Sequence, residues 1–146
     1  MSWKGNDMAW SAKHDRSNDI VEVVYTGDIT GTELRDAASE RIRLQKETGT
    51  MSVLVDASGI ERMVAGTMDL FGLPDELYVS KQAHRNSRMA LVLPRSRKER
   101  EGVRFFETVC ENRGWQVKEF EERQVAVDWL RETKPSNNPD APDGLK

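Results

Sequence analysis

The stretch VLVDASGIERMVAGT, residues 53–67, joins an apolar segment to a more polar one that carries Asp56, Ser58 and Thr67. Its first part belongs to MSVLVDA (51–57), a short apolar run bounded by turn residues, which predicts a buried strand. An acid and two hydroxyls after a strand are compatible with a catalytic site, a phosphorylation switch or a turn that leads into the next helix. The rest of the chain is needed to choose between these three.

Two strands and a helix are predicted upstream of this run. The segments 8–15 and 19–27 flank a polar turn, and the second is rich in β-branched residues, so together they predict an antiparallel hairpin. Thr30 and Glu33 have the spacing of a capping box, and apolar residues then recur at helical spacing as far as Gly49. A helix between these points is therefore expected, with the glycine at its C-terminal end.

Downstream, the segment 66–82 has helical character at both ends, but Gly72 and Pro74 interrupt it, so a kinked helix or two short helices are expected. The remaining elements are predicted as a strand at 87–94, a helix at 97–114, a strand at 115–120 and a helix at 121–132. Ser96 and Glu99 form a second capping-box pattern before the helix at 97. The positions expected to face the core are Val103, Phe106, Val109 and Cys110 in that helix, and Val125, Ala126, Trp129 and Leu130 in the last one.

The predicted order β-β-α-β-α-β-α-β-α indicates a single α/β domain. Strands that alternate with helices form a mostly parallel sheet with right-handed crossovers, and the first hairpin adds one antiparallel pair. A length of 146 residues suits one domain with one core. We expect a flexible N-terminus over 1–7, the domain over 8–132 and a disordered tail over 133–146, a segment rich in proline and poor in apolar residues.

The composition argues against several classes of function. A formal net charge of −3 does not favour nucleic-acid binding, which depends on a basic surface. No run approaches the ~18 apolar residues of a membrane span, and the N-terminus lacks the apolar core of a secretory signal. Cys110 is the single cysteine, so no intrachain disulfide can form and a cytoplasmic location is expected. The histidines and the cysteine have no metal-ligand spacing, and no cofactor is expected.

Several phrases of the sequence, taken together, resemble a known family. They are VVYTGDITGTELRDA, VLVDASGI, RMALVLP, and RFFETVCENRGW followed by EERQVAVDWL. They resemble STAS-type domains, the fold of bacterial anti-sigma-factor antagonists and of the cytoplasmic tails of sulfate transporters, and more closely the SpoIIAA-like subgroup of small stand-alone bacterial proteins. The resemblance covers about residues 8–132 and implies a STAS-like α/β fold with a regulatory, non-catalytic role.

The resemblance also implies where a phosphorylation switch would lie. Antagonists in this superfamily carry a D-L-S-G type phrase at the end of a strand and, several residues later, a D-S-S-G phrase whose serine a partner kinase phosphorylates. Here DASG (56–59) matches the first phrase, and VAGT (64–67) takes the place of the second, with Val64 at the acid and Gly66 at the acceptor. Thr67 is the remaining hydroxyl there, one place out of register, so the usual phosphoserine switch is not expected.

Each polar residue of the opening stretch has two interpretations. Ser58 lacks the G-x-S-x-G elbow of a hydrolase, and the only available histidines are His14 and His84, so a turn serine is favoured over a nucleophile. Asp56 ends a central strand, where ligands collect in open α/β sheets, or it caps the loop or the next helix. Thr67 is either the N-cap of the second helix or a phosphoacceptor.

A cluster of basic residues is a further candidate for binding. The segment 81–104 holds eight basic residues and two acidic ones, in an otherwise acidic protein. Arg95 and Arg97 lie where a helix begins, and cations are unfavourable there because of the helix dipole. The cluster therefore favours an anionic partner. The alternative is a solvated face in which Arg97 and Lys98 pair with Glu101.

The segment 63–79 concentrates apolar residues around the predicted helix break. They either line a ligand pocket or a dimer face, or form the core side of the second helix. We expect a non-catalytic regulatory module that binds a protein, such as a kinase-type regulator, or a second copy of itself. The residues expected to take part are Asp56, Ser58, Thr67, Met68, Phe71, Arg95 and Arg97. The alternative is a carrier or sensor of a small apolar or anionic ligand held under the kinked second helix.

Overall fold

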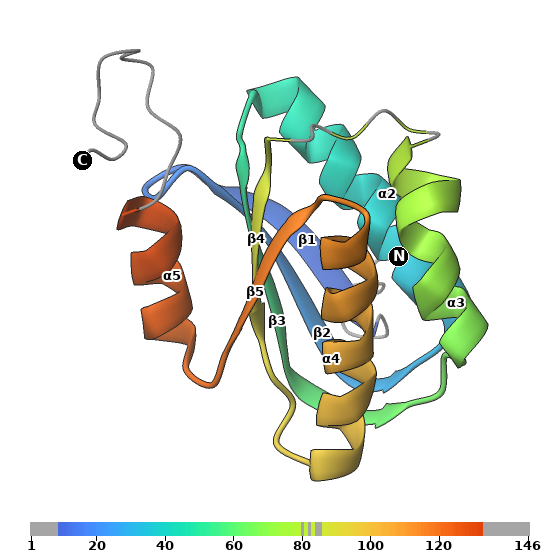
Figure 1. Ribbon diagram of the computed structural model, residues 1–146. Helices are drawn as coiled ribbons and strands as arrows, with labels where there is room; N and C mark the ends of the chain where they lie inside the picture. Colours follow the sequence, from blue (N-terminus) through green and yellow to red (C-terminus); the bar gives the residue numbers. More distant parts are fainter. Residues whose placement is uncertain (1–8, 80, 82, 84–85, 133–146) are drawn as a thin grey trace, which may run out of the picture.

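The protein folds around one five-stranded sheet whose strands lie in chain order, β1-β2-β3-β4-β5 (Figure 1). The computed structural model describes residues 9–79, 81, 83 and 86–132, so the termini predicted to be flexible lie outside the described residues. The strands are β1 (Trp10–Asp15), β2 (Ile20–Ile29), β3 (Ser52–Met63), β4 (Arg88–Val92) and β5 (Gln116–Phe120). β1 pairs antiparallel with β2, and the other neighbours are parallel, which confirms the predicted fold class.

Helices cover both faces of the sheet. They are α2 (Gly31–Thr48), α3 (Thr67–Gly72), the π-helix η1 (Leu73–Val79), α4 (Arg97–Asn112) and α5 (Arg123–Glu132). Each parallel strand is added on the same side of its predecessor, so right-handed crossovers bring α2, α3 and α4 to one face, and α5 covers the other (Figure 1). The larger apolar core lies beneath the three crossover helices and a smaller one beneath α5.

The ends of α2 form as the sequence predicts. Thr30 Oγ1 accepts a hydrogen bond from the backbone N–H of Glu33, and the Glu33 carboxylate accepts one from the N–H of Thr30, at 3.3 and 2.8 Å. Gly49 has φ 76°, a left-handed conformation, and its N–H donates to the Gln45 carbonyl. Capping box and glycine stop are both confirmed.

β3 is longer than predicted and continues from the apolar run to Met63. Its pairing with β4 ends at Asp56, but its pairing with β2 goes on to the last residue of both strands. The prediction of a loop after residue 57 was therefore wrong. Gly59 permits this extension, because a Cβ there would lie 2.9 Å from the Tyr25 carbonyl oxygen. The extension lacks an apolar run, so hydrophobic pattern alone did not reveal it.

The second helix is broken, as predicted. α3 ends at Gly72, and the chain continues as η1, with Pro74 in its first turn. Proline has no backbone N–H to donate and clashes with the preceding turn, so the regular α-helix cannot continue through it. The result is a short α-helix that is followed directly by a wider π-helix, and together they contact α2 and α4.

Two predicted details were wrong. Ser96 makes no side-chain capping bond to the backbone, because its hydroxyl donates instead to the Glu99 carboxylate at 2.7 Å. The other Glu99 oxygen accepts the backbone N–H of Met63 at 3.2 Å and so joins α4 to the end of β3. In α5, Val125 was expected to face the core but is 49% exposed, and Val127 is buried instead.

Candidate functional site

The structure places Asp56 and Ser58 within β3, and both side chains form hydrogen bonds within the protein. Asp56 Oδ1 accepts both the backbone N–H of Ser58, at 3.0 Å, and its hydroxyl, at 2.6 Å. Asp56 Oδ2 accepts a hydrogen bond from Arg123 of α5, at 3.0 Å, and Arg123 also pairs with the buried carboxylate of Glu22 on β2. This arrangement holds α5 against the sheet.

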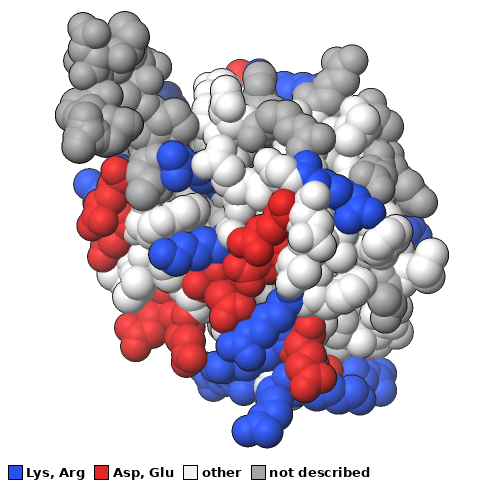
Figure 2. All heavy atoms as spheres, viewed as in Figure 1, with Lys and Arg blue, Asp and Glu red and all other residues white. Residues whose placement is uncertain are grey.

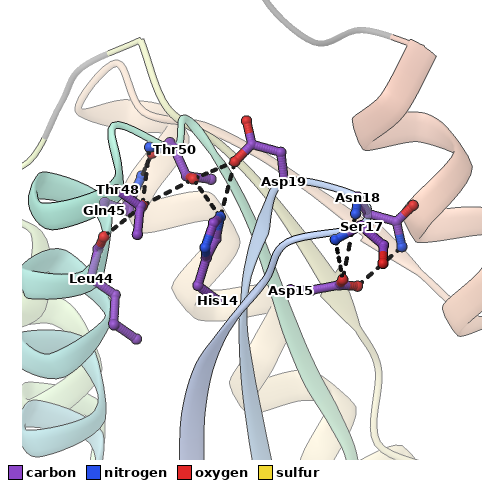
Figure 3. A network of polar contacts seen from close by, with 9 residues as sticks. All are labelled: His14, Asp15, Ser17, Asn18, Asp19, Leu44, Gln45, Thr48 and Thr50. Carbon is purple, nitrogen blue, oxygen red and sulfur yellow. Dashed lines mark hydrogen bonds and ion pairs between the residues drawn. The ribbon is translucent and has the colours of Figure 1, made fainter.

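His14 lies at the other end of the sheet from Ser58. Its Nε2 is 3.0 Å from both Thr50 Oγ1 and Asp19 Oδ1, and the Thr50 hydroxyl donates to Asp19 at 2.6 Å (Figure 3). Thr50 precedes β3, so eight extended residues, about 26 Å, separate it from Ser58. His14 therefore cannot serve Ser58 as a base, and His84 lies outside the described residues.

The network around His14 joins the β1–β2 turn to the end of α2. Asp15 stabilises that turn by accepting hydrogen bonds from the backbone N–H groups of Ser17 and Asn18 (Figure 3). Thr50 continues the network, because its backbone carbonyl accepts a hydrogen bond from Gln45 Nε2 at 3.1 Å. The network has a structural function and leads to the buried face of α2.

Met68 and Phe71 are exposed on α3, at 77% and 42%. Val64 and Val79, before and after them in the chain, are 49% and 53% exposed, so this outer surface of the broken helix is apolar. The Arg113 guanidinium lies 4.5 Å from the Phe71 ring centre. Thr67 is the first residue of α3, and its side chain lies outside what the structure describes, so its predicted regulatory role stays a prediction.

Arg95 and Arg97 are exposed where α4 begins, in the region where Figure 2 shows Lys and Arg gathered at the lower end of the molecule. Within the described part of the chain, neither forms an ion pair, and the predicted pairs of Arg97 and Lys98 with Glu101 do not form. Two other arginines of the segment are engaged, Arg100 with Glu121 and Arg104 with Glu119. The binding role of the exposed arginines stays a prediction.

The carboxyl groups of Glu107 and Glu119 form a pair beside Arg104, which is itself paired with Glu119. Burial and a hydrogen bond with Glu119 of β5 raise the pKa of Glu107 on α4 to about 7. Although burial opposes the change, hydrogen bonds from Arg104 and Glu107 lower the pKa of Glu119. Below about pH 7, Glu107 therefore holds a proton that Glu119 accepts in a hydrogen bond. The Glu107–Glu119 pair joins α4 to β5 and does not line the cavity under α3 and η1.

A cavity of about 50 Å³ lies between the sheet and the broken helix. Its lining is almost entirely apolar and comes from every element around it: Val23 and Tyr25 of β2, Leu34, Ala37, Ala38 and Arg41 of α2, Val55, Ala57, Ile60 and Met63 of β3, Leu70, Leu73 and Tyr78 of α3 and η1, Met89 and Leu91 of β4, and Val103 and Phe106 of α4. A water molecule needs about 10–15 Å³ by this kind of measure, so the cavity accepts a group of a few heavy atoms.

Arg41 is the charged residue of this lining, and it is 3% exposed. Its Nη1 donates to Gln45 Oε1 at 2.9 Å, and its guanidinium lies 4.7 Å from the Tyr78 ring centre. Among the described residues no carboxylate pairs with it. A cation–π contact contributes about 0.5–2 kcal/mol, whereas removing an ion from water costs several kcal/mol. The contacts that the described residues supply therefore compensate the charge of Arg41 only in part.

Sequence reasoning missed Arg41 and Gln45, although a signal was present. Both lie on the buried stripe of α2 at helical spacing from Ala37, Ala38 and each other. A cation and an amide at positions where the periodicity requires apolar residues indicate a buried polar site. Tyr25 and Tyr78, the two tyrosines beside Arg41, stay neutral because burial raises the pKa of both phenols.

The described residues show no sign of two further kinds of site, a metal centre and a membrane span. No group of three or more His, Cys, Asp or Glu side chains in that part of the chain could hold a metal ion. No helix there is both long enough and apolar enough to cross a bilayer. Cys110 is fully buried, and burial raises the pKa of its thiol, so it is held as a neutral core residue.

These elements define a small α/β domain with a mixed sheet and a cavity under a broken helix. Residues 20–131 match the family described as SpoIIAA-like, and the chain belongs to that family. The fold is similar to the crystal structure of an uncharacterized protein of the DUF3478 family with a SpoIIAA-like fold from Shewanella loihica PV-4. The TM-score is 0.54 at 16% identity, over 84% of this chain and 93% of that one. A search of curated proteins found no match.

Proposed function

We propose that the protein is a non-catalytic binding module that takes a small, largely apolar molecule into the cavity under α3 and η1. The observation that carries this proposal is the position of the cavity. Protein cores are packed as densely as organic crystals, and voids in them are few. This void lies beneath the one crossover helix that is broken, and its lining is apolar.

The covering segment is built to move more easily than the rest of the helical layer. α3 has six residues, and its N-cap, Gly66, makes no side-chain capping bond. The Asp69 carboxylate holds it to Arg35 of α2 at 3.1 Å, but this ion pair is exposed and contributes about 0–1 kcal/mol. A ligand larger than a few atoms requires α3 and η1 to move away from α2 and α4. We therefore expect a carrier or sensor in which the broken helix is displaced by the ligand.

The chemistry of the described residues supports binding over catalysis. A nucleophile needs a positioned base, and the Ser58 hydroxyl donates to Asp56 while His14 is held at the opposite end of the sheet. The thiol of Cys110 is buried within the core. These contacts supply structural stability to the fold and no base–nucleophile pair.

Thermal unfolding in the presence of 1-octanol tests this proposal. At ten times its dissociation constant, the alcohol should stabilise the protein by about 1.4 kcal/mol, which raises Tm by about 4 °C. The double variant Val23→Ile, Val103→Ile adds two methyl groups to the lining, and we expect it to raise Tm without ligand and to lose the response to 1-octanol. Val125→Ile adds the same group on an exposed site of α5 and serves as the control. An unchanged response in the filled variant would contradict the proposal.

A second candidate function is supported by the apolar outer surface of the same segment. Met68 and Phe71 on α3, with Val64 before it and Val79 at the end of η1, are exposed apolar side chains, and exposed apolar residues that gather in one region are typical of a protein-binding surface. A partner regulator or a second copy of the chain would bury these side chains, and the exposed Arg95 and Arg97 would attract an anionic group on that partner.

The variant Phe71→Asp tests this second candidate. A charge at the centre of an apolar contact is costly, so we expect a protein captured from source lysate by the wild type to be lost. Val125→Asp places the same charge at an exposed valine on the opposite face of the sheet and should retain it. Equal capture by both variants, or no capture by the wild type, would contradict a role for this surface.

A further inference from the structure

The buried charge of Arg41 has no acidic partner in the described structure. Buried guanidinium groups normally pair with carboxylates, because an uncompensated ion in an apolar environment is strongly unfavourable. The two buried carboxylates of the described residues are engaged elsewhere: Glu22 with Arg123 beneath α5, and Glu99 with Ser96 and the backbone of Met63. The cavity wall therefore carries a cation that none of the acidic side chains described in the structure neutralises.

Gln45 holds this cation in place. Its side-chain oxygen accepts from Arg41, and its Nε2 donates to the Thr50 carbonyl and to Ser87 Oγ, at 3.1 and 3.0 Å. Thr50 is in turn held by His14 and Asp19 of the β1–β2 turn (Figure 3). A neutral amide can orient a guanidinium without cancelling its charge. Its oxygen takes one of the five N–H donors of Arg41 and leaves others for a ligand.

The surroundings of Arg41 are otherwise apolar or neutral. Tyr25 and Tyr78 line the same cavity, and both lie close enough to the guanidinium to experience its charge. Beyond them the wall consists of aliphatic, methionine and phenylalanine side chains. The cavity thus has one positive end and an apolar remainder, the complement of an amphipathic molecule with one anionic group.

We propose that the ligand of this cavity is a small amphipathic monoanion whose carboxylate binds Arg41 and whose apolar chain lies among the residues under α3 and η1. This inference rests on the proposed function and adds the chemical class of the ligand. A carboxylate accepts two parallel N–H bonds from a guanidinium, a geometry that a neutral hydroxyl does not reproduce. Among the apolar side chains that line the cavity, this difference becomes a preference between otherwise matched ligands.

Calorimetric titration of the full chain with octanoate and with 1-octanol at pH 8 tests the proposal. The two probes share their alkyl chain, and we expect the wild type to bind octanoate about tenfold more tightly. Arg41→Met keeps a long apolar side chain and is expected to fold, since buried ions are often replaced by apolar groups without loss of stability. It should bind both probes with equal affinity. Arg43→Met removes a neighbouring, exposed arginine of α2 and should keep the preference within about twofold.

The outcomes distinguish this inference from the function on which it rests. Equal affinity of the wild type for the two probes overturns the anionic ligand and leaves the apolar cavity site in place, and this comparison needs no variant. A preference for octanoate that persists in Arg41→Met overturns the role of Arg41. If the wild type binds neither probe, the proposed function fails, and the inference fails with it.

Discussion

Gln45→Leu is expected to lower the free energy of unfolding by about 3 kcal/mol. Leucine has a similar volume, so the loss comes from hydrogen bonds and not from a void. The substitution removes three bonds at once, those to Arg41, the Thr50 carbonyl and Ser87 Oγ. All three partner residues are buried, so water does not replace the missing group.

Urea unfolding at pH 7 measures this effect directly. Gln124→Leu is the matched control, because Gln124 is exposed on α5 and its side chain donates to Asp128 one turn away; its change should stay within about 0.5 kcal/mol. A loss below about 1 kcal/mol for Gln45→Leu would show that Arg41 and its neighbours re-pair without the amide. That result would show that Gln45 does not hold the Arg41 guanidinium in place at the cavity wall.

Arg123→Met is expected to destabilise the protein by about 2 kcal/mol, below the 3–5 kcal/mol of a fully buried pair because Arg123 is itself 45% exposed. Without it, the side chains of Glu22 and Asp56, 7% and 14% exposed, face each other beneath α5. Lys13 remains 3.8 Å from Glu22, but it is largely exposed and compensates weakly. The lost attraction and the new repulsion act in the same direction.

A second substitution separates charge from packing in this cluster. Adding Glu22→Gln to Arg123→Met removes one of the two unpaired charges and should restore about half of the lost stability. Arg62→Met, which breaks the exposed pair of Arg62 with Asp28, should change the free energy of unfolding by less than about 0.5 kcal/mol. Equal losses for Arg62→Met and Arg123→Met would show that Asp56 does not hold α5 through Arg123.

Much of the fold was predictable because its signals are local. The capping box of Thr30 and Glu33, the glycine stop at Gly49 and the interruption at Pro74 each act within one turn of helix, and all three appear in the structure. The extension of β3 to Met63 was not predictable in this way. It depends on pairing with β2, whose residues lie more than thirty positions earlier in the chain.

The candidate site divides along the same line. Local composition predicted a basic cluster with Arg95 and Arg97, and both are exposed. For Met68 and Phe71 it left a binding face and the core side of the second helix as alternatives, and the structure exposes both residues. The partner of Asp56 could not be predicted, because Arg123 lies 67 residues away. Asp56 and Ser58, which were candidates for a functional site, thus contribute to the attachment of α5 to the sheet.

The cavity and its cation were accessible from sequence only in part. Arg41 and Gln45 interrupt the apolar stripe of α2, and that interruption indicates a buried polar site. It does not reveal what faces the site. The void arises where three strands and four helical segments meet imperfectly, and no local pattern encodes how side chains from such distant segments fill a shared space.

The most direct test of ligand binding under the broken helix is a methyl-resolved NMR titration with 1-octanol. Binding in the cavity should cause saturable shifts of the methyl groups of Leu73, Met89 and Val103, which line it. The methyl groups of Leu54 and Leu130, in the separate core beneath α5, should not shift and serve as an internal control. Shifts confined to the exposed Met68, shifts of equal size in both cores, or no shifts at saturating alcohol would contradict ligand binding in this cavity.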